Sequence, residues 1–395
     1  MSTLKVDAIR HNSATSDAIT TASDGTCTAK LTSIGGGQLS HRNIIINGDM
    51  RVAQRGVTST SSGYHTVDRF AVQFGGTDEA PTQAQASVAS GTTPYSLGFR
   101  KSFKITNGNQ TSGAGAGDRL FTQTKLEAQD IANSGWNYKS SSSFITLSFW
   151  VKSSVAQNFF GDIRTFDGTA QGYAFETGSL TADTWTKITK TIPGNSNLQF
   201  DNNVDSGLTI VFGVYHGTDY TDAGVTLNQW GTYNGNQRMP TNTTTWYTTN
   251  DATFEYTGVQ LEVGDTATSF EHRSFGEELQ RCIRYYQVLV DQAGGSSQKS
   301  FAIACAYSSG SMHSTHLLSP EMRAVPTLDY TTGTDYYRAF SNGSADPFND
   351  FTLVGNSHPH AVDLAVFNNL SVTAGSAVLV RTYNSAARVA FTSEL

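Results

Sequence analysis

The stretch "TGVQLEVGDTATSFEHRSFGEELQRCIRYYQ", from Thr257 to Gln287, carries the most ordered pattern in the chain. Its alternating start predicts a strand, then a turn and a short extended piece. Ser274 and Glu277 form an S-x-x-E capping pair, which predicts a helix from about residue 275. Its apolar residues recur at helical spacing and form one stripe, Leu279, Cys282, Ile283 and Tyr286. We expect this helix to join two β modules.

The residues before the helix predict an antiparallel β-sandwich. Apolar and polar residues alternate in "FITLSFWVKS" (144–153) and "GLTIVFGVYHG" (207–217), which indicates strands with one face on a core and one exposed. The apolar parity changes across Gly258, and a β-bulge there is the simplest explanation. About ten such strands between residues 41 and 272 are typical of a jelly-roll-like sandwich.

The chain divides into four expected parts. Residues 1–40 are too polar to bury a core and form an extended N-terminal arm for attachment or oligomerisation. Residues 41–273 form the jelly roll, and 274–290 the linking helix. Residues 291–395 again predict short strands with prolines between them, a small C-terminal β domain at the distal tip. The predicted fold class is therefore mainly β.

The composition of the chain argues against some classes of binding partner. A net charge of -7 and only 15% charged residues argue against a nucleic-acid partner, which would need a basic stripe. No run approaches 18 apolar residues, so no membrane insertion is expected, and the first residues lack the apolar region of a signal peptide. Three distant cysteines predict free thiols of a protein made in a reducing cytoplasm.

Several motifs carry a resemblance to a known family. "NIIINGDMRVAQRG" (43–56), "ITLSFWVKSS" (145–154), "TWTKITKTIPG" (184–194) and the opening stretch follow in the order of a module common in bacteriophage tail-fibre and other virion proteins. "MSTLKVDAI" (1–9) resembles the first residues of fibre-like proteins of marine phages, including cyanophages. The resemblance implies a jelly roll akin to carbohydrate-binding modules, an arm held by other virion tail proteins, and a homotrimer.

Three functions are open. The first is a homotrimeric tail fibre, external on the virion, that adsorbs to a host surface receptor by non-catalytic glycan or protein binding. The second is a purely structural head, neck or capsid appendage. The third is a glycan-degrading enzyme, for which Asp162, Asp167 and Glu176 could pair in a cleft. No serine-hydrolase elbow, zincin motif or P-loop is present, so we expect no enzyme and no cofactor.

The candidate glycan site lies in "LNQWGTYNGNQRMPTNTTTWYTTND" (227–251), where aromatic residues stand among turn residues. Aromatic faces stack on sugar rings, and amides and a guanidinium bond the hydroxyls. The residues are Trp230, Tyr233, Asn234, Asn236, Arg238, Trp246 and Tyr247. The alternative is that these aromatics pack the loop onto its own sheet.

No metal site is predicted. In sugar-binding jelly rolls a calcium-ligating acid ends the first motif, and Arg51 stands there instead. His358 and His360 would lie on one side of an extended segment, where three chains around an axis could offer six nitrogens to a transition metal. The alternative is a solvated loop around Pro359.

Overall fold

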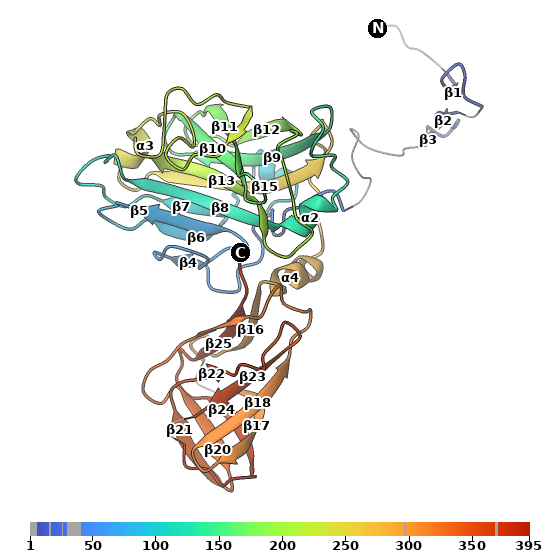
Figure 1. The fold of residues 1–395 in the computed structure, drawn as a ribbon. Helices are drawn as coiled ribbons and strands as arrows, with labels where there is room; N and C mark the ends of the chain where they lie inside the picture. The colour runs from blue at the N-terminus through green and yellow to red at the C-terminus, as the bar shows by residue number, and fades with distance from the viewer. Residues whose placement is uncertain (1–5, 16, 26, 30–40, 296–297, 368–369) are drawn as a thin grey trace.

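The computed structural model describes residues 6–15, 17–25, 27–29, 41–295, 298–367 and 370–395. A sandwich of two six-stranded antiparallel sheets forms the upper lobe in Figure 1. In order across each sheet, the first sheet contains β14 (Trp230–Thr232), β11 (Gln171–Ser179), β10 (Asn158–Thr165), β13 (Ser206–His216), β8 (Arg119–Glu127) and β5 (Ala71–Gly75); the second contains β12 (Thr186–Pro193), β9 (Phe144–Ser153), β15 (Thr253–Val263), β7 (Lys101–Thr106), β6 (Thr82–Ser87) and β4 (Thr58–Ser59). Short helices α1 (Thr93–Ser96), α2 (Ala128–Ala132) and α3 (Thr245–Thr248) lie in the connections. The mainly β, jelly-roll-like class is confirmed.

The core lies between the two sheets and is formed by the apolar residues that alternate along the strands, as the sequence predicted. On β9 the inward residues are Ile145, Leu147, Phe149 and Val151; on β13 they are Leu208, Ile210, Phe212 and Val214. The prediction that the opposite faces are exposed is wrong for β13, where Val211 is fully buried, and right only in part for β9, where Thr146 is fully buried but Trp150 and Lys152 are partly exposed. Segments distant in the sequence cover both outer faces; Thr146, for example, donates from Oγ1 to the carbonyl of Gly264 beyond β15.

The predicted bulge at Gly258 is confirmed. The pairing of β15 with β9 shifts register between Thr257 and Gln260, and Gly258 has a φ of +65°. A Cβ on Gly258 would lie 2.6 Å from the ring of Phe99. Glycine is therefore required here both for its backbone conformation and for the space it leaves.

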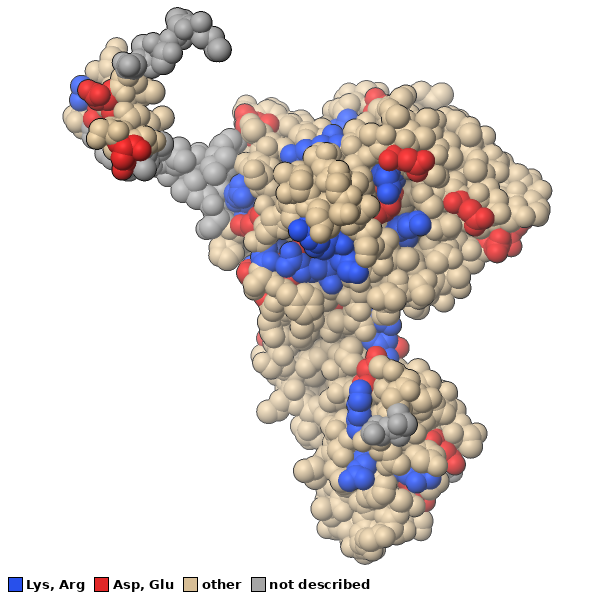
Figure 2. All heavy atoms as spheres, turned by 180° about the vertical axis from the view of Figure 1, so that it is seen from behind, with Lys and Arg blue, Asp and Glu red and all other residues tan. Residues whose placement is uncertain are grey.

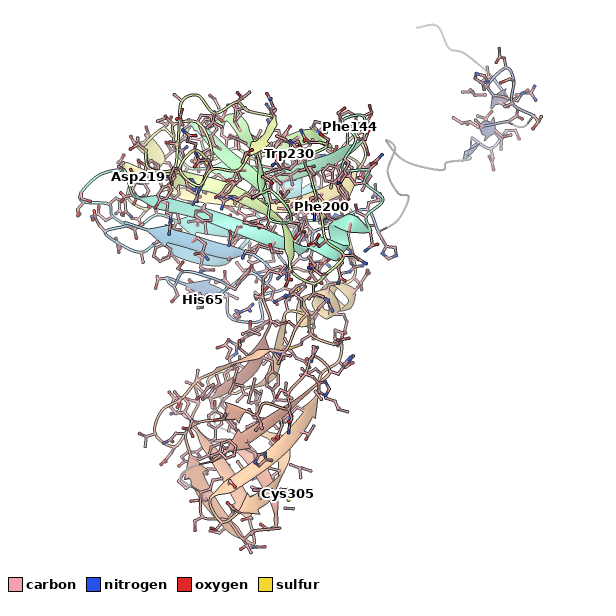
Figure 3. All side chains as sticks on the ribbon, in the orientation of Figure 1. His65, Phe144, Phe200, Asp219, Trp230 and Cys305 are labelled. Atoms are coloured by element: carbon pink, nitrogen blue, oxygen red, sulfur yellow. The ribbon has the colours of Figure 1, made fainter. Side chains whose placement is uncertain are left out.

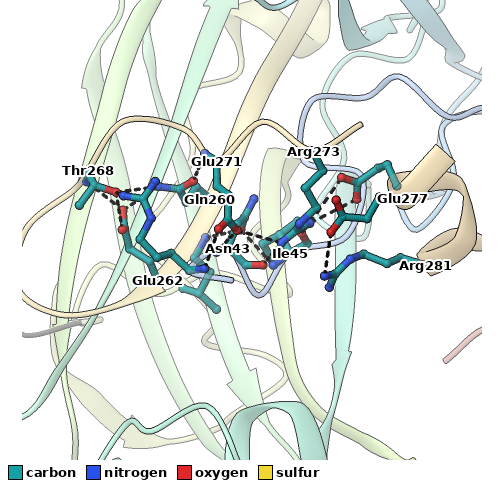
Figure 4. A network of polar contacts seen from close by, with 12 residues as sticks. Asn43, Ile45, Gln260, Glu262, Thr268, Glu271, Arg273, Glu277 and Arg281 are labelled. Carbon is teal, nitrogen blue, oxygen red and sulfur yellow. Dashed lines mark hydrogen bonds and ion pairs between the residues drawn. The ribbon is translucent and has the colours of Figure 1, made fainter. Parts of the chain in front are cut away.

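A buried polar cluster, which we call the clasp, ties the first motif of the jelly roll to the last (Figure 4). Asn43 donates from Nδ2 to the carbonyl of Val259, and its Oδ1 accepts from the backbone N–H groups of Ile45 and Leu261. The Glu271 carboxylate accepts from the backbone N–H groups of Arg42 and Asn43. The residues behind the family resemblance thus hold the fold together.

Arg273 is the centre of the clasp. Its guanidinium donates to the carbonyls of Asn43 and Ile45 and pairs with Glu271 and Glu278, and its side chain is only 4% exposed. Glu278, in the helix, also accepts a hydrogen bond from the backbone N–H of Asn47. The helix is therefore joined to the jelly roll by charge-assisted bonds as well as by its apolar stripe.

Helix α4 spans Phe275–Ile283, and Ser274 is its N-cap, with Oγ accepting from the backbone N–H of Glu277. The segment expected to be helical to residue 290 instead turns into β16 (Tyr286–Asp291). That strand pairs with β25 (Arg388–Thr392), because the residues after Ile283 are mostly aromatic or β-branched and fit a sheet better than a helix.

Two sheets form the lower lobe in Figure 1. The three-stranded sheet contains β16, β25 and β19 (Thr327–Tyr330); the seven-stranded sheet contains β21 (Ser344–Phe348), β20 (Tyr337–Ser341), β24 (Ala377–Thr382), β17 (Ser300–Ser308), β18 (Ser311–Leu317), β23 (Ala361–Val366) and β22 (Thr352–Leu353). A separate apolar core that includes Tyr337, Val378 and Val389 lies in this lobe. Cys305 is exposed there, towards the far end (Figure 3), and Cys282 is buried in α4; both are free.

Buried charges join the two lobes. The Glu394 carboxylate pairs with Arg55 and Arg69, and the two guanidinium groups lie over the rings of Tyr286 and Tyr285, 3.6 and 3.4 Å from the ring centroids. Arg284 forms two 2.8 Å bonds to Glu127, and Arg323 donates to the carbonyl of Val204. Such paired and stacked groups favour a fixed arrangement of the lobes.

The N-terminal arm forms a small sheet that lies apart from both lobes in Figure 1. It contains β1 (Ala8–Ile9), β2 (Ile19–Thr21) and β3 (Cys27–Ala29). Val6 and Ile9 are 41% and 53% exposed. The expectation for residues 1–5, 16, 26 and 30–40 lies outside the described residues. Within the described part of the chain, no helix has the length and apolarity to cross a bilayer.

Candidate functional site

A pocket of about 400 Å³ lies on the outer face of the first sheet. Its floor is β10 and β11, and its wall is the segment after β13, residues 217–239, which includes β14 and which we call the cover segment. The cover segment is held to the sheet by hydrogen bonds from the backbone N–H groups of Asn228 and Tyr233 to the carbonyls of Ala174 and Ala170. Arg119 of β8 also donates to the Tyr220 hydroxyl.

Besides Trp230, three of the predicted glycan-binding residues line this pocket with polar or aromatic side chains. Tyr233 and Arg238 are half-buried, and Asn234 is exposed and donates from Nδ2 to Gln237. Asn236 is exposed beside them but does not line the pocket. Its backbone N–H donates to Oδ1 of Asn234. The sequence therefore located the cover segment and part of its chemistry.

The other three predicted residues are core residues. Trp230 borders the pocket, but its ring packs 5.2 Å from that of Tyr173 and its Nε1 donates to the carbonyl of Pro193, inside the upper lobe in Figure 3. Trp246 and Tyr247 of α3 are completely buried, and Tyr247 stacks on Tyr215 with ring centroids 4.2 Å apart. The prediction that Trp246 and Tyr247 contact a glycan is corrected, because both side chains are fully buried and anchor the loop to the core. Trp230 is 7% exposed at the pocket wall, and its role stays a prediction.

The sheet supplies residues that were not predicted as ligand contacts. Asp162 lines the pocket and accepts from Nε and Nη2 of Arg164. The Arg164 guanidinium lies 5.2 Å from the centroid of the Tyr233 ring, and so supports that ring from below. Asp162 and Arg164 alternate with the core residue Ile163 on β10. In the sequence, two opposite charges at alternate positions of a strand could have indicated a polar site on its outer face.

Positive charge gathers under the cover segment. His216 is 1% exposed, stacks on Phe121, and neither ring nitrogen has a partner in the described part of the chain. Burial, with Arg238 next and then Arg164 and Arg119, lowers the pKa of His216 well below its usual value. The imidazole is therefore neutral. On the face seen in Figure 2, the upper lobe carries one larger patch of Lys and Arg, and smaller groups of both signs lie around it.

The three carboxylates considered for glycan cleavage do not share one pocket, and each already has a partner in the protein. Asp162 is paired with Arg164, Glu176 accepts from Nδ2 of Asn158, and Asp167 accepts from the backbone N–H of Asp201. The first carboxylate lines the pocket, and the other two do not.

His358 and His360 lie in a tight turn rather than on an extended segment. The backbones of His358 and Ala361 bond each other in both directions, which places the two imidazole centroids 6.0 Å apart. His360 is exposed and lies 3.3 Å from a carboxylate oxygen of Glu321. Among the described residues, no group of three or more His, Cys, Asp or Glu side chains could hold a metal ion.

A second, smaller cavity of about 200 Å³ lies on the outer face of the second sheet. Its walls include Trp150, Phe99 and Phe270, and few of its lining groups are charged. It is an aromatic hollow without the converging polar groups of the first pocket, and it provides an internal comparison for binding experiments.

No family model and no curated protein matches the chain. Solved structures with a similar arrangement include the CBM22-1 xylan-binding domain from Paenibacillus barcinonensis Xyn10C, with 10% identity over 60% of this chain and 100% of that one and a TM-score of 0.29. A putative sugar binding protein from Bacteroides thetaiotaomicron VPI-5482 has 11% identity over 56% and 99%, with a TM-score of 0.30. These structural neighbours are carbohydrate-binding modules or sugar-binding proteins by description. At such scores the likeness carries no argument about what this chain binds.

Proposed function

We propose that the chain is a non-catalytic glycan-binding protein and that the pocket under the cover segment is its binding site. The observation that carries the proposal is the pocket itself, in which amide, hydroxyl and guanidinium groups converge beside the face of Tyr233. Sugars are bound by such a combination, since the ring faces are apolar and the hydroxyls need directed partners. A volume of about 400 Å³ accommodates a short oligosaccharide.

The pocket's acids support binding rather than cleavage. Both oxygens of Asp162 are bonded to Arg164, and those of Asp222 accept from Gly224 and Gln237. A glycosidase needs one carboxyl free to protonate the leaving group and a second to attack or to activate water. These two side chains are already committed to other partners, which makes them structural supports.

Glycan-array binding of the full chain tests this proposal, with Tyr233→Ala as the pocket variant. Trp150→Ala, in the second cavity, is the matched control because it also removes an accessible aromatic ring from an outer sheet face. We expect Tyr233→Ala to abolish array binding and Trp150→Ala to preserve it. The reverse pattern would move the site to the second sheet, and an array without any bound glycan would reject the proposal.

We further propose that the protein is a virion appendage, a homotrimeric tail fibre that adsorbs to host surface glycan or protein. The motif resemblance supports this, and so do Val6 and Ile9 of the arm, whose exposed apolar side chains suit burial against other virion proteins. Purified full chain should then compete with whole phage for host cells. If a verified oligomer with a functional pocket fails to compete, the alternative of a structural head, neck or capsid appendage takes its place.

A further inference from the structure

Among the charged side chains that line the pocket, Arg238 forms the fewest hydrogen bonds. The carboxylates that line the pocket, Asp162 and Asp222, have both oxygens engaged by other groups. Arg238 uses only its Nε, which donates to the carbonyl of Gly235 at 2.8 Å. Its side chain forms no ion pair with any acid in the described ranges, so both terminal nitrogens remain available.

The guanidinium of Arg238 is held in place before any ligand arrives. It lies 5.0 Å from the centroid of the Tyr220 ring, and the backbone N–H of Arg238 donates to the carbonyl of Tyr220. Together with the Gly235 contact, these interactions restrict a long side chain that would otherwise lose much rotamer entropy on binding. A fixed guanidinium with two free N–H edges matches the two oxygens of a carboxylate.

Among the described residues, no carboxylate lies within ion-pair distance of Arg238, although Asp162 and Asp222 line the same pocket. Arg164 and Arg119 lie on β10 and β8, the strands on either side of β13, and His216 at the end of β13 is neutral and without a hydrogen-bond partner in the described chain. Burial, followed by the neighbouring Arg164, lowers the pKa of Arg238 by more than Tyr233 and Asp162 raise it, so nearby groups compensate its charge only in part. Asp162 is itself held by Arg164.

We propose that the pocket selects glycans that carry a carboxylate, such as a uronic acid, and that Arg238 binds this carboxylate through its two terminal nitrogens. The inference rests on the proposed glycan-binding function and names its ligand class. In the bound state the sugar ring lies against Tyr233 while the acid group reaches Arg238, since both side chains line the same pocket. The ligand thereby supplies the carboxylate that pairs with Arg238.

Matched trisaccharides test the proposal: one member ends in galacturonic or glucuronic acid, the other in galactose or glucose. Titration calorimetry of the full chain should give the acidic member a roughly 10- to 100-fold lower Kd than its neutral partner. Raising the salt concentration should reduce that preference, because the pocket is open to solvent on one side.

Variants assign the effect to the side chain. Arg238→Gln should remove the preference while leaving weak binding of both members, and Arg238→Lys should restore only part of it, because an ammonium lacks the planar pair of donors. Arg100→Gln is the control: Arg100 also lies over a tyrosine ring, Tyr95 at 3.9 Å, but is exposed on another part of the jelly roll. Tryptophan fluorescence confirms that each variant is folded.

The outcomes separate this inference from the proposed function. Equal affinity for both members, with loss of binding in Tyr233→Ala, would overturn the carboxylate preference and keep the glycan site. An acid preference that persists in Arg238→Gln would overturn the role of Arg238. If neither member of any pair binds, the glycan site and its carboxylate preference both fail.

Discussion

Replacing Arg273 with methionine tests whether the clasp holds the jelly roll together. The variant keeps a long apolar side chain but removes the donors to the carbonyls of Asn43 and Ile45 and leaves the buried Glu278 carboxylate without its partner. Breaking a buried pair of this kind costs about 3–5 kcal/mol. With a urea slope of roughly 3 kcal/mol per molar, the unfolding midpoint should fall by roughly 1 to 1.7 M.

Tryptophan fluorescence is the assay, because all five tryptophans of the chain precede Thr257 and so report on the jelly roll alone. Arg100→Met is the control, since the exposed Arg100 donates only to two nearby carbonyls. Adding Glu278→Gln to Arg273→Met should recover about 0.5–3 kcal/mol by removing the orphaned charge. If Arg273→Met shifts the midpoint no more than Arg100→Met does, the clasp does not stabilise the fold as argued.

Three further perturbations address other parts of the structure. Gly48→Ala would place a Cβ 2.1 Å from the carbonyl oxygen of Val259, and we expect a loss of about 1–3 kcal/mol in the same urea assay. His216→Phe tests pH dependence: because the folded protein holds the pKa of His216 well below 6.5, the unfolded chain binds a proton that the native protein does not, so native stability falls as pH drops below 6.5. The difference between wild type and His216→Phe should therefore change by up to about 1.4 kcal/mol per pH unit in urea titrations below pH 6.5, and a constant difference would show that the imidazole is not held neutral. Glu394→Gln leaves Arg69 and Arg55 without their shared carboxylate, and hydrogen exchange should rise at the junction of the lobes but not in the strands of either core.

The sandwich was predictable because its signals are local. Alternating apolar residues in 144–153 and 207–217 identify strands whose inward faces form the core, and the change of apolar parity at Gly258 identifies the bulge. The helix start at Ser274 follows from a hydrogen bond between neighbouring residues. Each of these depends on short-range geometry that the order of residues contains.

The candidate site was only partly predictable, because partners distant in the sequence decide which side chains are accessible. Tyr233, Trp246 and Tyr247 are equivalent in the sequence as aromatics among turn residues, yet the first borders the pocket and the other two are fully buried. What separates them is packing against Tyr215 and the other core strands, which composition does not encode.

The sequence by itself determined the β class, the strand faces, the bulge and the start of α4, because hydrogen-bond geometry and side-chain periodicity act over a few residues. Only the tertiary structure decided that Asp162 of β10 meets Tyr233 and Arg238 of the cover segment in one pocket, with Arg164 against the Tyr233 ring. It also decided that the outer face of β13 and part of the outer face of β9 are buried. Both results depend on segments far apart in the chain packing onto the same sheet, where desolvation and charge pairing choose the neighbours.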